Sequence, residues 1–238
     1  MPPAAPDVTA TSADGVRPRG ELPVAARRWV DHAVRPGSEG IRHAELRMHG
    51  EILVGRWRPF RAHQVIDAGT AFTWSASAGR GPLAIRGADR FDGGEGAMDW
   101  RVLGVPVMRA RGPDVSRSAA GRLAAETVLC PPAALDPRVR WSPGPDDGHA
   151  TYRITVGAWE HAVAIAVDEG GALTAVDTAR WGDPHGDGHG LHPFHVACEG
   201  GLAQGGVTIP GVVRAGWRDP DGAVREFFRA TIDAATFR

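Results

Sequence analysis

Apolar and polar residues alternate along most of the chain from residue 41 onward. In residues 43–49, for example, Ala44, Leu46 and Met48 occupy every second position between polar residues. This is the pattern of a strand with one buried face. The same period recurs in residues 71–78 and 151–156. By this period we count about ten strands, and the turn-rich segments between them suit hairpins, which predicts one long antiparallel sheet.

A sheet of this length has two edges and a large apolar face, and both need protection from solvent. We therefore predict a mainly β protein of the α+β kind, in which one curved antiparallel sheet forms a half-barrel or barrel. Two sheets packed face to face in a sandwich are the alternative.

Residues 114–130 form the clearest helical segment. A Gly-Pro pair breaks the preceding strand, Asp114 or Ser116 is placed to cap the first turn, and two prolines at 131–132 end the segment. Small residues fill its middle: Ala119, Ala120, Gly121, Ala124 and Ala125. Because side chains this short let a helix lie close against a sheet, we expect this helix on the concave side. A solvated, alanine-rich surface helix is the alternative.

A second helical stripe covers residues 21–34, with Pro23 suited to the first turn. We expect this helix to plug one end of the sheet. Residues 1–20 are rich in Pro, Ala, Asp, Thr and Ser and contain no apolar stretch of signal-peptide type. We therefore expect a disordered lead at 1–20, a single domain at 21–238 and a cytoplasmic location. No apolar run approaches the roughly 20 residues of a membrane span.

Composition excludes several classes of function. A formal net charge of -1 argues against nucleic acid as a partner. All 27 basic residues are arginines, which excludes a lysine Schiff base or a phosphate-loop lysine. Cys130 and Cys198 are too few for a disulfide framework, and we expect buried free thiols. No nucleophile elbow, phosphate loop or dinucleotide motif is present, so we predict no cofactor. The oligomeric state stays open.

Tryptophan is unusually frequent: the chain has 8 Trp and 1 Tyr. An indole offers a large apolar surface and one N–H donor, which suits an amphiphilic ligand. Because a curved sheet has one concave face, several of these side chains can line the same cavity; ordinary core packing is the alternative. The aromatic candidates for ligand binding are Trp57, Trp74, Trp100 and Trp181.

Polar residues at otherwise apolar positions give a second group of candidates: Gln64, Arg117, Arg122, Glu126 and Arg180. Arg122 and Glu126 are four residues apart, so they can share one face of a helix. Inside a curved sheet such groups need partners, because an unpaired buried charge is costly. They form either a structural network or a ligand site. A catalytic version uses Glu126 or His63 as general base and Arg122 to stabilise an anion.

Histidines crowd residues 183–195: His185, His189, His192 and His195 occur there with two aspartates. These side chains have the chemistry for zinc or another divalent ion. The helix that would align His185 with His189 is opposed by Gly186, Gly188, Gly190 and Pro193. A flexible loop also loses much entropy when it organises a metal site. We therefore favour a mobile lid with solvated histidines over a metal site.

Several motifs resemble an uncharacterised bacterial family that carries only a domain-of-unknown-function label. They are Phe60-Arg-Ala-His-Gln64, Arg117-Ser-Ala-Ala-Gly-Arg-Leu-Ala-Ala-Glu126, Thr208-Ile-Pro210 and Glu226-Phe-Phe-Arg229. The likeness covers residues 21–238 and implies no activity. In strand–helix–strand order the chain is also similar to lipoprotein-carrier half-barrels, which enclose acyl chains under a helical lid. Those carriers are exported, whereas this N-terminus does not read as a signal peptide.

Three functions fit these observations. The first is binding of an apolar or amphiphilic small molecule in the concave face of the sheet. The second is a cofactor-independent enzyme, such as a cyclase, isomerase or hydrolase of secondary metabolism, with a Glu/Arg/His site in the same pocket. The third is a scaffold that binds a partner along an exposed sheet edge.

Overall fold

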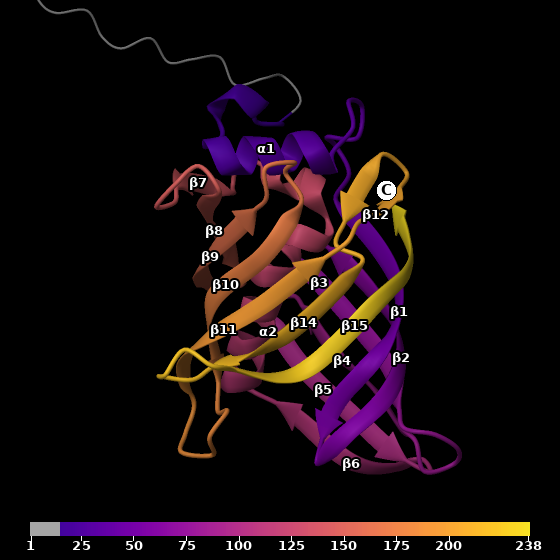
Figure 1. Cartoon of the computed structure of the whole chain (residues 1–238). Helices are drawn as coiled ribbons and strands as arrows, with labels where there is room; N and C mark the ends of the chain where they lie inside the picture. Colours follow the sequence, from indigo (N-terminus) through magenta and orange to yellow (C-terminus); the bar gives the residue numbers. More distant parts are fainter. Residues whose placement is uncertain (1–14) are drawn as a thin grey trace, which may run out of the picture.

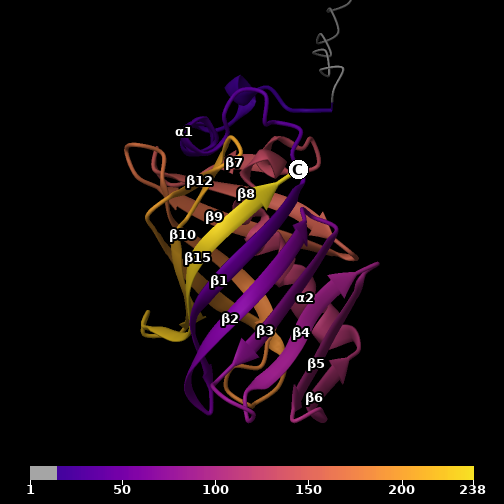
Figure 2. The same ribbon diagram turned by 90° about the vertical axis from the view of Figure 1, so that its right-hand side faces the viewer.

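Thirteen antiparallel strands form one continuous curled sheet in the computed structural model, which describes residues 15–238. Figures 1 and 2 show the sheet curling into a half-barrel around a central helix. The strands of this sheet are β1 His43–Val54, β2 Arg56–Asp67, β3 Ala71–Ala78, β4 Ile85–Asp92, β5 Glu95–Val102, β6 Val105–Arg111, β7 Arg140–Pro143, β8 His149–Val156, β9 Trp159–Val167, β10 Leu173–Gly182, β11 Gly190–Glu199, β14 Val212–Arg218 and β15 Val224–Phe237. A separate two-stranded sheet pairs β12 Leu202–Gln204 with β13 Val207–Ile209. The predicted curved antiparallel sheet is confirmed, and the sandwich does not form.

The strand order shows how the two halves of the chain join. It runs β6-β5-β4-β3-β2-β1-β15-β14-β11-β10-β9-β8-β7. Almost all neighbours are consecutive in sequence, as hairpins require. The exception at the centre is β15, which returns along β1 with Ala44 opposite Phe237. The last strand therefore joins two meanders into one surface, and β6 and β7 are left as its two edges.

Two turns were not predicted, because their sequences continue the strand period. Gly55 lies between β1 and β2 with a φ of 68°, so the hairpin turns there, and Pro59 lies within β2. Leu103 and Gly104 separate β5 from β6 with φ values of 51° and 81°. A two-residue hairpin turn needs such positive φ values. Leu103 lacks the Asn or Asp that normally signals this turn, so residues 96–109 read as one strand.

The central helix α2 spans Pro113–Ala125 and continues as two 3₁₀ helices, η2 Glu126–Leu129 and η3 Pro131–Leu135. The prediction at 114–130 is confirmed, but the α-helix ends earlier, and the two prolines begin η3. Neither predicted cap bonds to the first turn. Asp114 Oδ1 instead accepts a hydrogen bond from Trp181 Nε1 at 2.8 Å, and Ser116 Oγ accepts one from Gly96 N at 2.9 Å. Both side chains attach the helix to the sheet.

Helix α2 bridges the two ends of the open sheet. It packs against β4, β5 and β6 on one side and against β8, β9 and β10 on the other. Small residues allow this approach: Gly96 passes α2 so closely that a Cβ there would lie 2.6 Å from Val115 O. On the opposite side Tyr152 OH donates to Ala124 O at 2.8 Å. The helix therefore fills the gap of the half-barrel and leaves the middle strands uncovered on their concave face.

Helix α1, Val24–Ala33, covers the upper end of the half-barrel, as predicted for residues 21–34 (Figure 1). Trp29 is fully buried there and contacts Trp141 with ring centroids 6.2 Å apart, whereas Val24 is 40% exposed. The expected disordered lead falls, for residues 1–14, outside the described residues. Its remainder enters the 3₁₀ helix η1, Arg19–Glu21, and Arg17 N donates to Leu135 O at 2.7 Å.

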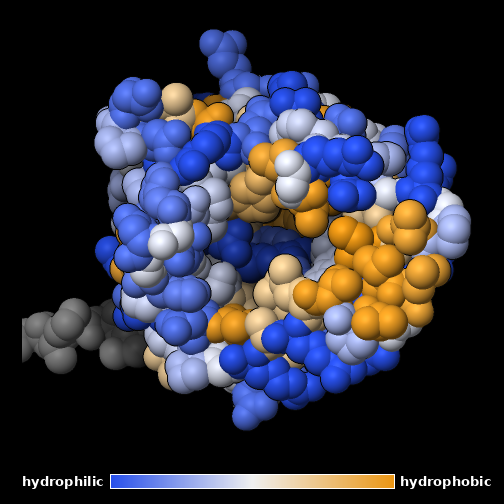
Figure 3. Space-filling view, turned by 90° about the horizontal axis from the view of Figure 1, so that it is seen from below, coloured by the Kyte–Doolittle hydropathy of each residue, from blue (hydrophilic) through white to orange (hydrophobic). Residues whose placement is uncertain are grey.

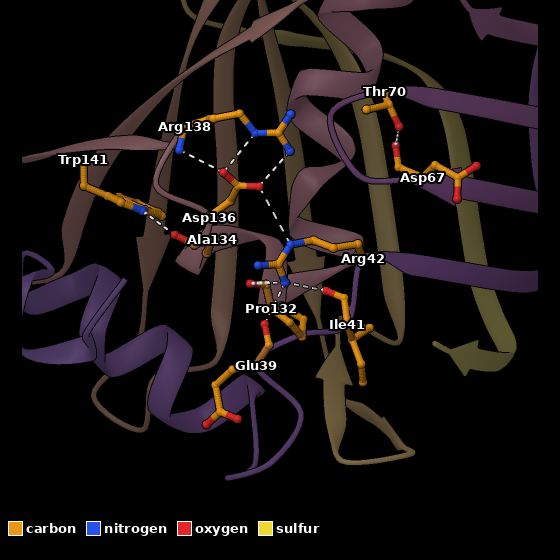
Figure 4. A network of polar contacts seen from close by, with 10 residues as sticks. All are labelled: Glu39, Ile41, Arg42, Asp67, Thr70, Pro132, Ala134, Asp136, Arg138 and Trp141. Carbon is orange, nitrogen blue, oxygen red and sulfur yellow. Dashed lines mark hydrogen bonds and ion pairs between the residues drawn. The ribbon is translucent and has the colours of Figure 1, made fainter. Parts of the chain in front are cut away.

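A polar network ties η3 to the start of β1 at this end (Figure 4). Arg42 Nη1 donates to the carbonyl oxygens of Glu39, Ile41 and Pro132 at 2.6, 2.8 and 3.3 Å. Asp136 Oδ2 accepts from Arg138 Nη2 at 2.7 Å and lies 3.8 Å from Arg42 Nε. Burial opposes ionisation of Asp136, but its bonds to Arg138 prevail and hold its pKa below the usual value.

Both cysteines are free and buried. Burial raises the pKa of the Cys130 and Cys198 thiols to about 12. Among the described residues, no helix has the length and apolar character needed to cross a bilayer.

Gly121 tests the close packing of α2. A Cβ at this position would lie 3.4 Å from His161 Cε1, which is ordinary contact, whereas a longer side chain would overlap the ring. We expect Gly121→Leu to lower the free energy of unfolding by about 1–3 kcal/mol through overpacking. Gly121→Ala is the matched control and should leave stability unchanged or slightly raised, because alanine favours helix. Urea denaturation measures both; equal stability of the Leu variant and the wild type would contradict this placement of the helix.

Candidate functional site

A cavity of about 690 Å³ lies between α2 and the middle strands of the sheet. This size is typical of small-molecule sites. We call the concave surface of β1, β2, β11, β14 and β15 the far wall, because it faces α2 across the cavity. Apolar side chains supply most of the lining: Met48, Ile52, Phe72, Trp74, Met98, Met108, Val196, Val213, Trp217, Phe227, Phe228 and Ile232. Seen from below, the molecule is hollowed, with hydrophilic residues in the depth and a hydrophobic patch beside the opening (Figure 3).

One polar cluster lies at this cavity and takes its residues from α2, the start of η2 and the three strands β2, β4 and β5. Arg122 Nε donates to Glu126 Oε1 at 2.8 Å, and Gln64 Nε2 donates to Glu126 Oε2 at 2.6 Å. Arg122 Nη1 also donates to Asp89 Oδ2 at 3.3 Å. Trp100 Nε1 completes the cluster by donating to Asp89 Oδ1 at 2.8 Å. One guanidinium thus serves two carboxylates, and each carboxylate also accepts a neutral N–H donor.

Burial dominates the electrostatics of Asp89. It raises the pKa of this carboxyl, although Arg122 and the Trp100 hydrogen bond both act to lower it. Such a shift means that the protein holds the charged form of Asp89 at a cost. Arg122 is therefore the partner on which the ionised state of the cluster depends.

Arg180 on β10 enters the cavity from the other side of α2. Its Cζ lies 4.5 Å from the ring centroid of Phe194 and 5.7 Å from that of Trp217. Burial and the neighbouring Arg122 lower the pKa of Arg180 to about 10, so it stays protonated at neutral pH. Next to it, burial and the charges of Arg117 and Arg180 lower the pKa of His161, whose ring packs against α2 at Gly121.

The structure brings five of the sequence-predicted residues together on the cavity surface: Gln64, Trp74, Arg122, Glu126 and Arg180. Trp100 lies behind Trp74, with ring centroids 5.7 Å apart, and supports Asp89. Trp57 contacts Arg229, whose Cζ is 4.4 Å from its ring. Arg117 stacks on Trp181 at 3.8 Å, so this pair fastens α2 to β10.

His63 is not brought near Glu126. Its side chain is 51% exposed, and its Nε2 lies 3.8 Å from Glu45 Oε2. The neighbouring Gln64 is 2% exposed and faces the cavity. Adjacent strand residues point to opposite faces, so the inward position of Gln64 places His63 outside. The Glu/Arg/His grouping therefore lacks its histidine from this strand.

Sequence reasoning missed Asp89 and the aromatic residues of the far wall. Phe227 and Phe228 are adjacent, so strict alternation would have sent only one of them inward. A register shift in the β14–β15 ladder pairs Ala215 with Phe228 and Gly216 with Glu226, which leaves Phe227 as an extra residue. Such a bulge changes where side chains point. Both phenylalanines consequently line the cavity. The adjacent Phe pair opposite Gly216 was the available signal.

The histidines of 183–195 divide between a loop and a strand. His185 and His189 lie in the loop, whereas β11 begins at Gly190 and fixes His192 and His195. His195 Nδ1 lies 2.8 Å from Asp177 Oδ1, and the His192 ring is 6.1 Å from that of Trp217. Within residues 15–238, no group of three or more His, Cys, Asp or Glu side chains is arranged to hold a metal ion. The loop is thus shorter than the histidine-rich segment 183–195, and His189 from it borders the cavity.

Comparison with known proteins gives a family and several structural neighbours, among them the following two. The model of a family of unknown function, DUF6544, matches residues 17–230. A LolA superfamily protein from Nitrosomonas europaea has 11% identity and a TM-score of 0.47 over 90% of this chain and 93% of its own. A domain from Vibrio parahaemolyticus, named for outer membrane lipoprotein sorting, has 8% identity and a TM-score of 0.46 over 93% and 94%. No curated protein matches the chain. The family match confirms the resemblance inferred from the motifs, and the neighbours carry the names that the weaker resemblance suggested.

Replacing Arg122 tests the polar cluster. In Arg122→Met, Asp89 loses the cation that acts against its burial, so its pKa, already raised in the wild type, rises further. A raised carboxyl pKa means that the folded state binds more protons, so stability falls as pH rises above the unfolded pKa. We expect a loss of about 3–5 kcal/mol at neutral pH and a clearly smaller loss near pH 5.

Urea denaturation at the two pH values measures this difference. Arg117→Met is the matched control on the same helix, because Arg117 stacks on an aromatic ring and holds no buried carboxylate. The same loss at both pH values for Arg122→Met would show that the cluster does not depend on this charge.

Proposed function

We propose that this chain, which belongs to the DUF6544 family of unknown function, binds an apolar or amphiphilic small molecule between α2 and the far wall. Membership of the family assigns no activity, so the proposal is based on the geometry of the cavity. The observation that carries this proposal is the cavity of about 690 Å³ with a mostly apolar lining. Protein interiors are normally close-packed, and unfilled apolar volume destabilises them. A guest that covers this surface would recover that loss.

The helix side of the cavity is built to leave room. Ala119 and Ala125 of α2 both line the space, and neither side chain extends beyond Cβ. On a helix that bridges the sheet ends, larger residues at these positions would fill the interior. The small residues predicted to bring the helix close to the sheet therefore also keep the space in front of the far wall open.

Methionines give the lining an adaptable surface. The chain has 4 methionines, and Met48, Met98 and Met108 all lie on the cavity. An unbranched thioether side chain adjusts its shape to a guest at little cost. Aromatic rings from β14 and β15, including Trp217 and Phe228, form a stiffer part of the same lining. This combination suits a flexible chain or ring system more than a small polar metabolite.

The enzyme hypothesis receives less support from the same geometry. Both carboxylate oxygens of Glu126 accept hydrogen bonds, one from Arg122 and one from Gln64. A general base must reach a proton of the substrate. Glu126 is held by its protein partners, and His63 lies on the outer face. The cluster therefore acts in this proposal as a polar boundary of the binding site.

A cavity-filling variant tests the proposal. Val213 on β14 lines the cavity, whereas its neighbour Arg214 is exposed on the outer face. We expect the wild type to bind the neutral fluorescent probe N-phenyl-1-naphthylamine saturably, and Val213→Trp to weaken that binding roughly tenfold or more, which corresponds to about 1.4 kcal/mol.

Arg214→Trp adds the same indole outside and should leave probe affinity unchanged. Fluorescence titration gives the dissociation constants, and thermal melting confirms that both variants are folded. Absence of saturable binding by the wild type, or equal affinity of Val213→Trp and wild type, would refute the proposal.

A further inference from the structure

The cavity surface contains hydrogen-bond donors without acceptors. Trp74 Nε1 and Arg180 Nε are buried and have no hydrogen-bond partner within the described part of the chain. Both residues line the cavity, and both free groups are N–H donors. Leaving such donors unpaired in the interior is costly. A ligand that supplies acceptor oxygens would remove this cost.

The carboxylates near Arg180 are committed elsewhere. Asp89 and Glu126 are both bound to Arg122, and neither forms an ion pair with Arg180 among residues 15–238. A third carboxylate on the cavity surface, Asp183, accepts hydrogen bonds from the backbone amides of Gly186 and Gly188. The polar cluster has one cation and two carboxylates, so one negative charge remains. The positive charge of Arg180 compensates this charge without direct contact.

Aromatic rings hold the guanidinium of Arg180 in a way that keeps its donors free. Phe194 and Trp217 present their ring faces to its Cζ at 4.5 and 5.7 Å. A cation over a ring face is stabilised by the electrons of the ring, while the N–H groups point outward in the guanidinium plane. On the helix side, Cγ of Arg180 lies 4.0 Å from where a Cβ of Gly121 would stand. The side chain is thus positioned from two sides without using its planar fork.

We propose that the guest is an amphiphile with an oxyanion headgroup, either a carboxylate or a phosphate. The oxygen atoms of this headgroup accept hydrogen bonds from the N–H groups of Arg180. Its apolar chain then lies along the methionine and aromatic residues of the cavity. A planar guanidinium suits such oxyanions because it can donate two parallel hydrogen bonds. This inference rests on the proposed function and adds the chemical class of the ligand.

Headgroup competition tests the inference in the full-length protein. Dodecanoate, dodecyl phosphate, 1-dodecanol and dodecyltrimethylammonium share one chain length, and each is added below its micelle-forming concentration to displace N-phenyl-1-naphthylamine. For the wild type we expect an anionic headgroup to displace the probe at a concentration about tenfold or more below that of the alcohol. The cation should compete least. A preference for dodecanoate or for dodecyl phosphate identifies which oxyanion the site takes.

Substitution of Arg180 assigns the preference to this residue. Arg180→Met keeps a side chain of similar length without charge, and we expect the anion preference to disappear when the competitors are compared with one another at the variant's own probe affinity. Arg180→Lys should keep part of the preference, because it retains the charge but not the fork. Arg61→Met, an exposed position on β2, is the control and should keep the full preference.

The outcomes separate this inference from the function on which it rests. A wild type that does not bind the neutral probe contradicts the proposed function and this inference together. Probe binding without a headgroup preference overturns this inference and leaves the proposed function standing. An anion preference that survives in Arg180→Met overturns the assignment of that preference to Arg180. Thermal melting without ligand adds a readout: retained stability of Arg180→Met with lost preference supports a ligand role, and lost stability with retained preference shows a structural one.

Discussion

The close contact between α2 and the two ends of the sheet is the constraint on which the remaining structure depends. A sheet of thirteen strands curls but does not close, and its edges β6 and β7 stay apart. One helix of small residues bridges that gap through β4–β6 and β8–β10. Because the helix is slender and is fixed at the gap, it cannot also fill the concave face. The cavity follows from this geometry, and so does its shape, with a helix on one side and the far wall on the other.

The same helix brings charge into an apolar interior. Arg122 and Glu126 project from it toward strands β2 and β4, where Gln64 and Asp89 complete their hydrogen bonds. Arg180 approaches from β10 and places its guanidinium over the aromatic faces of Phe194 and Trp217. Within the described residues 15–238, the interior therefore contains a satisfied polar cluster and a nearby cation without a contacting anion. A satisfied cluster stabilises a fold, whereas an unsatisfied cation on a cavity surface is the kind of group that binding sites use.

Much of this architecture was predictable from local sequence patterns. Alternation in β1, β3 and β8 predicted the antiparallel sheet, and the small residues around Gly121 predicted the close helix. Strand parity alone would have separated Gln64 from His63, since neighbours on a strand face opposite sides. The alternation of polar and apolar residues does not show where a strand is interrupted by a turn or a bulge. The turns at Gly55 and Leu103 interrupt unbroken patterns, and the shift opposite Gly216 turns Phe227 inward against the period.

Long-range partners were also beyond the sequence. Asp89 looked like any strand aspartate, and only the curvature of the sheet places it beside Arg122, 33 positions away. Trp100 was predicted to face a ligand but supports Asp89 from behind. Arg117 and Trp181 were both predicted for the site, and they instead stack on each other where α2 meets β10. Residue type indicated the chemistry of these positions, but the fold decided which side chains share the cavity.

A crystal structure of the protein grown with dodecanoate would locate the guest and its headgroup together. We expect electron density for an extended chain between α2 and the far wall, in contact with Met48 and Phe228, with its carboxylate at the guanidinium of Arg180. An interior closed by the protein's own side chains, or a ligand bound only on the outer surface, would contradict this expectation.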